Sequence, residues 1–334
     1  MSARALYAAF ALLAIVATPA RAADLPRGFA KLRAQDALVQ RVGYRLADGN
    51  GALCPQTAPA TGLLLHDLAT YGEEDARALQ AGLALAGPIG VESVVPGSPA
   101  ARAGIALDDT VLAIGNRSIG DFPFDARRSW ARLQAIEAAL ETALRADGVA
   151  RLTLSRNGER RTVELGAVPA CATRFEVAPV GSKAAAEGTR VVIGPKFAGF
   201  AYPEEEFAAV LAHELAHNIL RHRALLEREG RSMRNERETE READRMMPWL
   251  LANGGYDPMA AARFMQRFGP VHDGGIFRDG SHDGWKDRAR DLSIEAQLVT
   301  QTRQVTGAAD WRIRFSAELA RAAALPPAEA ADGG

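Results

Sequence analysis

His213 and His217, four residues apart and with Glu214 directly after the first, constrain this sequence more than any other feature. Residues i and i+4 lie one turn apart on the same face of a helix, so both imidazoles can reach a single Zn²⁺. Glu214 would then lie beside the metal, placed to take a proton from water. Apolar residues at helical spacing predict that the motif lies on an inward-facing helix that begins near Pro203. The alternative is an unliganded pair of core histidines.

A third zinc ligand is expected in the charged helical segment that follows, because catalytic zinc usually takes three protein ligands. Glu236 and Glu240 fall on the apolar stripe of that segment, whereas Glu238 and Glu242 point away. A carboxylate on a buried stripe needs a cation or a hydrogen-bond partner. We expect Glu240 to be the ligand and Asp244, one turn later, to accept a hydrogen bond from a ligand histidine. Helical geometry alone leaves Glu236 as a rival.

The N-terminus has the three regions of a secretory signal: the basic residue Arg4, an apolar run over 5–17, and the small-x-small pattern at 20–22. The run is shorter than the roughly 20 residues that span a bilayer. We expect cleavage after Ala22 and a mature chain in a bacterial periplasm, without a membrane span. The alternatives are an uncleaved anchor and a buried N-terminal helix.

The composition excludes some functional classes of protein. The chain has 334 residues, with 40 basic against 41 acidic side chains, which argues against a nucleic-acid binder. Two cysteines cannot form a cysteine-built zinc cluster. In an oxidising compartment Cys54 and Cys171 most simply pair with each other, the alternative being two buried free thiols.

A segment of about 85–167 resembles a PDZ domain of the bacterial protease-associated type. The residues that carry the resemblance lie at 98–100 (SPA), 103–105 (AGI), 108–111 (DDTV) and 114–116 (IGN). The segment departs from that pattern in the long run between Asn116 and the final hairpin. PDZ domains bind extended peptides by adding them to a sheet edge, so the resemblance implies peptide recognition or gating. A blocked or purely structural groove is the alternative.

The histidine motif and the segment from Glu240 to Asp244 together resemble the HtpX/BepA-type zinc metallopeptidases, which are gluzincins of metallopeptidase family forty-eight. The resemblance implies Glu240 as third ligand and Asp244 as its partner. It also implies that the strand at 189–193 is the edge strand on which an extended substrate lies.

The same resemblance extends to a later element, Ser281-His282 with Arg288, although Asp283 stands where the family has proline. It implies that His282 faces the metal, either stabilising the oxyanion or occupying the fourth zinc position, with Arg288 nearby. His272, in a similar His-Asp-Gly context, is a competitor for that role.

The expected fold class is α+β: a mainly helical zincin-like peptidase domain with a small edge-strand sheet, plus a small β-rich PDZ-like domain. The expected elements are helices at 29–46 (ended by a turn at 48–51), 73–85, 127–145 and from 203, strands at 62–68, 174–177 and 189–193, and a hairpin of 150–154 with 162–165. The expected parts are a signal peptide (1–22), an N-terminal helix and linker of the peptidase core (23–60), an inserted PDZ-like domain (61–168), the metallopeptidase domain (169–325) and a disordered tail (326–334). A bond between Cys54 and Cys171 would clamp the two stems of the insertion.

The function that these features imply is a periplasmic endopeptidase with one Zn²⁺ per chain, acting on protein or peptide substrates and not on nucleic acid. Envelope protein quality control is implied at the level of the family only. The alternative from another class is a latched or inactive zinc-containing protein that binds peptides like a chaperone. A metal-independent scaffold that uses only the PDZ groove is a further alternative.

Overall fold

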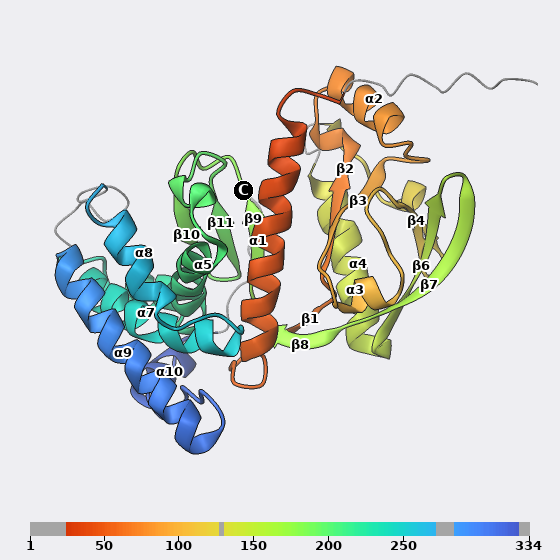
Figure 1. Ribbon diagram of the computed structural model, residues 1–334. Helices are drawn as coiled ribbons and strands as arrows, with labels where there is room; N and C mark the ends of the chain where they lie inside the picture. Colours follow the sequence, from red (N-terminus) through yellow and green to blue (C-terminus); the bar gives the residue numbers. More distant parts are fainter. Residues whose placement is uncertain (1–24, 127–129, 272–283, 327–334) are drawn as a thin grey trace, which may run out of the picture.

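The computed structural model describes residues 25–126, 130–271 and 284–326. Two units lie on either side of the long helix α1 (Phe29–Asn50): a sheet unit, residues 61–167, and a helical unit, residues 172–326 (Figure 1). The mixed α+β organisation predicted from the sequence is therefore present. The predicted signal segment, both His272 and His282, and the tail from residue 327 lie outside the described residues.

The sheet unit is built on a strongly curved antiparallel sheet with the strand order β2-β3-β4-β6-β7, and β5 pairs with β4. Its strands are β2 (Leu63–Asp67), β3 (Ile89–Val94), β4 (Thr110–Ile114), β5 (Arg117–Ser118), β6 (Val149–Arg156) and β7 (Glu159–Gly166). Its helices are α2 (Glu73–Gly82), α3 (Pro99–Arg102) and α4 (Ala131–Asp147). The predicted hairpin is present, because Asn157 and Gly158 both adopt the positive φ that a tight two-residue turn requires.

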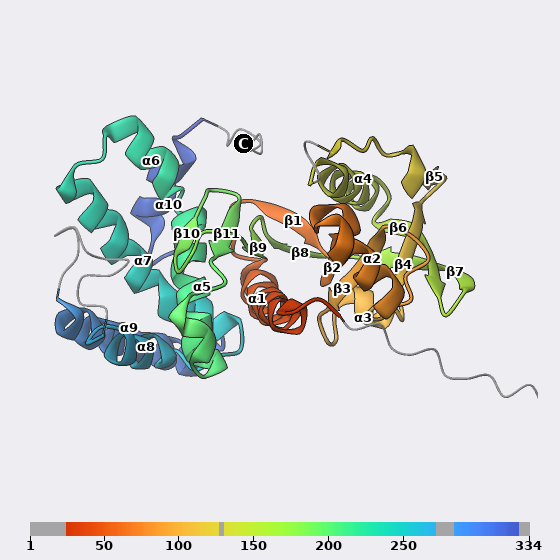
Figure 2. The ribbon, with the colours of Figure 1, turned by 90° about the horizontal axis from the view of Figure 1, so that it is seen from above.

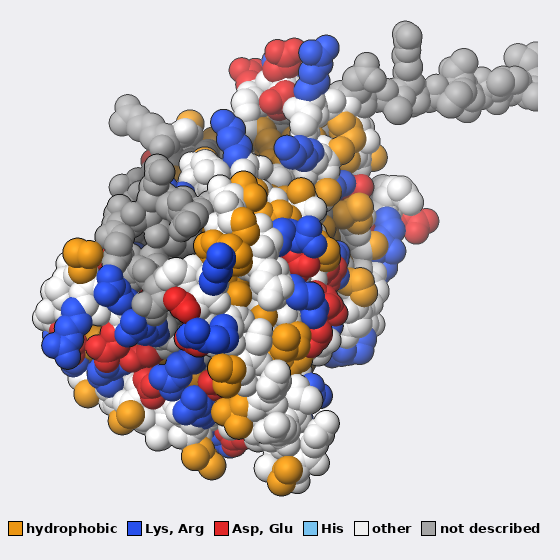
Figure 3. All heavy atoms as spheres, turned by 60° about the vertical axis from the view of Figure 1, so that its left-hand side comes forward, with side chains coloured by type: hydrophobic (Ala, Val, Ile, Leu, Met, Phe, Trp, Pro, Cys, Tyr) orange, Lys and Arg blue, Asp and Glu red, His pale blue; other side chains and the backbone are white. Residues whose placement is uncertain are grey.

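The helical unit packs its helices around α5 (Figures 1 and 2). Its helices are α5 (Glu204–Ile219), α6 (His222–Glu229), α7 (Met233–Asn253), α8 (Ala260–Phe268), α9 (Trp285–Thr306) and α10 (Ser316–Ala323). On the face drawn in Figure 3, acidic and basic side chains are interspersed. Among the described helices, none has both the length and the apolar character needed to cross a membrane.

A three-stranded sheet lies beside α5, and its strand order differs from the expectation that the strand at 189–193 lies at the edge. Its strands are β9 (Arg174–Val177), β10 (Ala184–Ala186) and β11 (Arg190–Ile193), in the order β10-β11-β9. The strand predicted at 189–193 is β11, which is central because it pairs with a neighbour on both sides. Within the described residues, β10 pairs only with β11, so β10 rather than β11 is the edge strand on this side.

Helix α1 belongs to both hydrophobic cores. Phe29, at its start, packs with Leu68 and Leu79 of the sheet unit. Val42 and Leu46, farther along, are fully buried in the core of the helical unit. A single rigid element therefore joins the two units.

The predicted turn at 48–51 is wrong, because α1 continues through it to Asn50. Asn50 is fully buried, and its side-chain amide donates to the carbonyls of Leu46 and Leu250, which fixes this last turn as helix. Gly49 serves close packing rather than a turn: a Cβ at this position would lie 2.2 Å from the carbonyl oxygen of Asn253.

The chain leaves α1 along β1 (Thr57–Ala60) and returns from the sheet unit along β8 (Val168–Cys171), and these two strands form an antiparallel ribbon. The predicted disulfide between Cys54 and Cys171 is present at the base of this ribbon, with a Cα–Cα distance of 5.3 Å. The two cysteines are 117 positions apart in the sequence, and the loop that they close contains the whole sheet unit.

Replacing both Cys54 and Cys171 by serine should lower the free energy of unfolding by about 2–4 kcal/mol, because the bond restricts a long loop in the unfolded chain. Urea titration of the oxidised parent and of the double variant measures the difference. Peptide mapping without reductant should recover the two cysteines in one linked pair, and free thiols in the parent would contradict the prediction.

Charged side chains also join α1 to the sheet unit. Arg33 of α1 contacts Glu92 of β3 at 3.2 Å and Asp108 at 2.8 Å, and Glu92 is almost fully buried. Asp36, one turn after Arg33, is half-buried in the same region. Burial, reinforced by the negative charge of Glu92, raises the pKa of Asp36 to about 7.

The raised pKa gives Asp36→Asn an effect on stability that depends on pH. The folded chain keeps the Asp36 proton up to about pH 7, whereas the unfolded chain releases it near pH 4. The parent therefore loses stability as the pH rises from about 4 to about 7, and this loss is complete above pH 7. The variant should therefore gain urea resistance relative to the parent at pH 8, and the gain should be clearly smaller at pH 5. Asp75→Asn, on the exposed surface of α2, is the control, and an equal gain at both pH values would contradict the prediction.

Candidate metal centre

Helix α5 carries the histidine motif through the middle of the helical unit. Pro203 precedes the helix, and Glu204, Glu205 and Glu206 fill its first turn, where acidic residues stabilise the positive end of the helix dipole. The helix is buried along nearly its whole length, since α1, α7, α8 and β10 all pack against it. Such burial places His213 and Glu214 away from solvent.

Helix α7 brings the carboxylates to the histidines. Glu240 and Asp244 lie one turn apart on α7 and face α5. The Nε2 atom of His213 is 3.2 Å from Glu240, and the Nε2 atom of His217 is 3.4 Å from the same carboxylate. The two Nε2 atoms are 3.1 Å apart. Three donor atoms from two helices therefore converge on one point.

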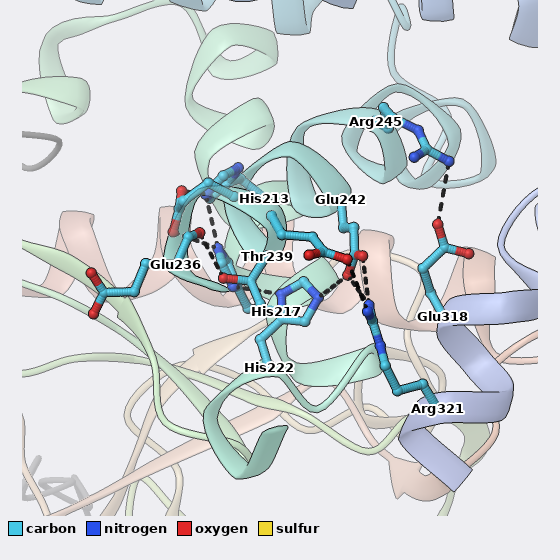
Figure 4. A network of polar contacts seen from close by, with 11 residues as sticks. His213, His217, His222, Glu236, Thr239, Glu242, Arg245, Glu318 and Arg321 are labelled. Carbon is cyan, nitrogen blue, oxygen red and sulfur yellow. Dashed lines mark hydrogen bonds and ion pairs between the residues drawn. The ribbon is translucent and has the colours of Figure 1, made fainter. Parts of the chain in front are cut away.

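The spacing of these atoms fits zinc. Bonds from zinc to nitrogen or oxygen are about 2.0–2.1 Å long, so two ligands of a tetrahedral ion lie roughly 3.3–3.4 Å apart. The two Nε2 atoms are 3.1 Å apart, and each lies 3.2 or 3.4 Å from one of the two oxygens of Glu240. One donor atom from each of the three residues lies within 4.8 Å of the other two. Two imidazoles and one carboxylate are also a ligand set found in catalytic zinc sites. The site thus passes a test of both chemistry and geometry. Glu236, the rival ligand, extends away from the histidines (Figure 4).

The electrostatics favour a cation at the same point. Burial alone would lower the pKa of His213, but contacts with Asp244 and Glu240 outweigh it and raise this pKa to about 10. In contrast, burial lowers the pKa of His217 to about 3. His217 is therefore neutral, the form in which imidazole binds metals. The negative charges of Glu240 and Asp244 stabilise a positive charge at His213. A bound metal ion would supply that positive charge in place of the proton.

Asp244 holds His213 from behind. One of its oxygens lies 3.1 Å from the Nδ1 of His213, and both oxygens accept hydrogen bonds from Arg288 of α9 at 2.7 and 2.8 Å. Burial would raise the pKa of Asp244, but Arg288 and His213 keep it well below its usual range. The carboxylate stays charged, so it can orient the imidazole with Nε2 towards Glu240.

Glu214 is held against the edge strand. Burial raises the pKa of its carboxyl to about 7, and the backbone N–H of Ala186 in β10 donates a hydrogen bond to it. A pKa near neutrality suits a residue that must both take and give a proton. Sequence reasoning did not identify Ala186, because three successive alanines carry no strand pattern.

The position of Glu242 on α7 predicted that this side chain points away from the apolar stripe into solvent. The structure instead buries it. It is 5% exposed and accepts a hydrogen bond from the Nε2 of His222 at 3.0 Å. Arg321 of α10 contacts both oxygens of the same carboxylate. The expectation failed because α6 and α10 cover a second face of α7, which the apolar stripe does not reveal.

A small, mainly apolar pocket adjoins the site. Its polar side is formed by His213, Glu214 and Arg288, and its other lining residues are Ala184, Phe197, Val210, Met247, Phe264 and Phe268. The pocket has room for about one water molecule next to these polar groups.

Comparison with protein families identifies a PDZ domain at residues 90–129, which begins in β3 and ends just before α4. The chain contains a PDZ domain. The comparison with curated proteins found no match. The family match lies wholly within the sheet unit, and it supports recognition of peptides or proteins by that unit.

The purified protein should bind about one Zn²⁺ per chain. Losing a residue that only supports a ligand typically weakens metal binding about 10–100-fold, and Glu240→Ala, which removes a ligand, should weaken it more than that. Glu236→Ala, a change of the same kind one turn earlier on α7, should leave the affinity unchanged. Competition with a coloured chelator measures both values. Equal losses in the two variants would contradict the assignment of Glu240.

Proposed function

We propose that the protein is a zinc-dependent metalloendopeptidase that hydrolyses peptide bonds in protein substrates of the periplasm. The observation that supports it most strongly is the convergence of His213, His217 and Glu240 at the spacing of zinc ligands, with Glu214 beside them. A structural zinc site would have no need of Glu214, because its carboxylate is not one of the converging donors. The secretory pattern at residues 1–22 supports the location.

The outer edge of β10, which pairs with no other strand of the described residues, supports a peptide substrate. Lys183 and Glu187 flank this strand and bond towards β11. The carbonyl of Lys183 accepts from the N–H of Gly194, directly after β11, and the N–H of Glu187 donates to the carbonyl of Arg190. Successive residues of a strand alternate between its two edges, so the N–H of Ala186 lies on the opposite edge, where it bonds Glu214. An extended chain that pairs with this edge would pass directly over the donor cluster. In this proposal β10, rather than β11, receives the substrate.

Each residue then has a defined role. His213, His217 and Glu240 would hold the ion. Bound Zn²⁺ supplies Lewis acidity, which acidifies water and polarises a carbonyl oxygen at neutral pH. Glu214 accepts the proton of the attacking water and delivers it to the leaving amine, a transfer that suits its raised pKa.

Asp244 and Arg288 would maintain the geometry of the site. Asp244 orients the ring of His213, and Arg288 neutralises the charge of Asp244. The role proposed for His282, stabilising the oxyanion, rests on the family resemblance, since this residue lies outside the described part of the chain.

The PDZ domain would select or present the substrate. Its attachment through α1 and the β1–β8 ribbon places it next to the helical unit, as an inserted domain would be (Figure 1). A peptide recognised there belongs to the same class of molecule that the metal site would cleave.

A second candidate is a zinc-containing peptide-binding protein without turnover. The detected PDZ domain favours it, because peptide recognition needs no catalysis. Zinc content combined with cleavage of an unfolded substrate separates the two candidates: the enzyme shows both and the binding protein only the first.

Glu214→Gln should retain zinc and lose proteolysis by at least about 100-fold, because the amide cannot accept the proton. Cleavage of casein by the zinc-loaded parent and variant measures the loss, and metal analysis shows that the ion is retained. Glu205→Gln, an exposed change on the same helix, should cleave at the parental rate. Unchanged cleavage by Glu214→Gln would show that the base is another residue.

A further inference from the structure

His222 lies at the start of α6, directly behind the histidine motif. Arg221, just before it, adopts a left-handed conformation with φ 56° and ψ 38°. This sharp turn at the end of α5 directs His222 back towards that helix. His222 is 1% exposed, so its two ring nitrogens can be satisfied only by protein groups.

Both nitrogens of His222 have partners. Its Nδ1 lies 2.8 Å from the Nδ1 of His217, and its Nε2 lies 3.0 Å from an oxygen of Glu242. Arg321 of α10 holds both oxygens of Glu242. Figure 4 shows the resulting chain of contacts from α5 through α6 and α7 to α10.

The positions of the protons follow from the direction of each ring. The Nε2 of His217 faces His213 and Glu240, and an imidazole that binds a metal ion through Nε2 carries its proton on Nδ1. A neutral imidazole has one donor and one acceptor. The Nδ1 of His222 therefore accepts from His217, and its Nε2–H donates to the Glu242 carboxylate.

This chain matches the one behind the other histidine. His213 is held by Asp244, which is held by Arg288. His217 is held by His222, which is held by Glu242 and Arg321. Each imidazole thus has an outer support that includes a carboxylate of α7 and ends on an arginine, from α9 in one case and from α10 in the other.

We propose that His222 is a positioning residue of the metal site, which keeps the Nε2 of His217 turned towards the ion, and that Glu242 and Arg321 keep His222 in that orientation. The inference rests on the proposed zinc site and adds to it residues from α6, α7 and α10. Packing alone does not explain this arrangement, since well-packed apolar residues often replace buried ion pairs without loss of stability.

Three substitutions of His222 separate positioning from packing. Asparagine places an amide oxygen near the position of Nδ1 and can still accept from His217. Glutamine places its amide near Nε2 and can bond only Glu242, and leucine can bond neither. Zinc affinity should fall about 10–100-fold in His222→Gln and His222→Leu, the range for losing an outer partner, and should remain close to the parental value in His222→Asn.

The readouts are chelator competition for Zn²⁺ and the visible absorption spectrum of the Co²⁺-substituted protein, which reports ligand geometry. The Gln and Leu variants should change the Co²⁺ spectrum, and the Asn variant should not. A role in packing alone would predict equal affinities and spectra in all variants that fold.

A second pair of variants tests the outer end of the chain and does not depend on the folding of the first set. Glu238 and Glu242 both pair with Arg321, but Glu238 is 52% exposed on its side chain and Glu242 is buried. Glu242→Ala should weaken zinc binding and alter the Co²⁺ spectrum, whereas Glu238→Ala should do neither.

The outcomes distinguish the two levels of the proposal. A parent that binds no stoichiometric zinc overturns the proposed metal site together with this inference. A parent that binds zinc, with His222→Gln and Glu242→Ala equal to it in affinity and spectrum, overturns the positioning role and leaves the proposed site intact.

Discussion

The packing of α5 against α7 determines where the candidate metal site of this protein lies. It places two imidazoles and a carboxylate about 3 Å from one another, away from solvent. A polar or charged group that is buried without a partner destabilises the folded chain, so these side chains depend on one another and on their neighbours. The contacts around them act on this one arrangement. Asp244 with Arg288 and His222 with Glu242 hold the rings from behind, and β10 approaches from the side.

The two units are joined by elements that limit their relative movement. Helix α1 is buried in both cores, Arg33 pairs with two carboxylates of the sheet unit, and the ribbon of β1 and β8 is closed by a disulfide. A PDZ domain attached in this way is close to the helical unit and cannot swing freely from it. Recognition of a peptide by one unit and its proposed cleavage by the other would therefore take place at a fixed separation.

Features set by local periodicity could be predicted from the sequence. The spacing of His213 and His217, and of Glu240 and Asp244, follows from the helix repeat, and the structure brings these side chains together. Features set by contacts between distant segments could not. The buried side of Glu242 depends on α10, which lies about 80 residues later, and the edge position of β10 depends on which neighbour β11 finds on each side. The continuation of α1 through Gly49 likewise depends on the backbone of Asn253, which is far away in the sequence.

The covalent ring closed by Cys54 and Cys171 changes what a cut in the sheet unit can do. Any single backbone break between the two cysteines leaves both fragments attached, because the sulfur bridge still connects them. A nicked molecule would run as one band on a gel without reductant and as two bands with it. The PDZ domain can thus suffer such damage without being shed from the rest of the molecule.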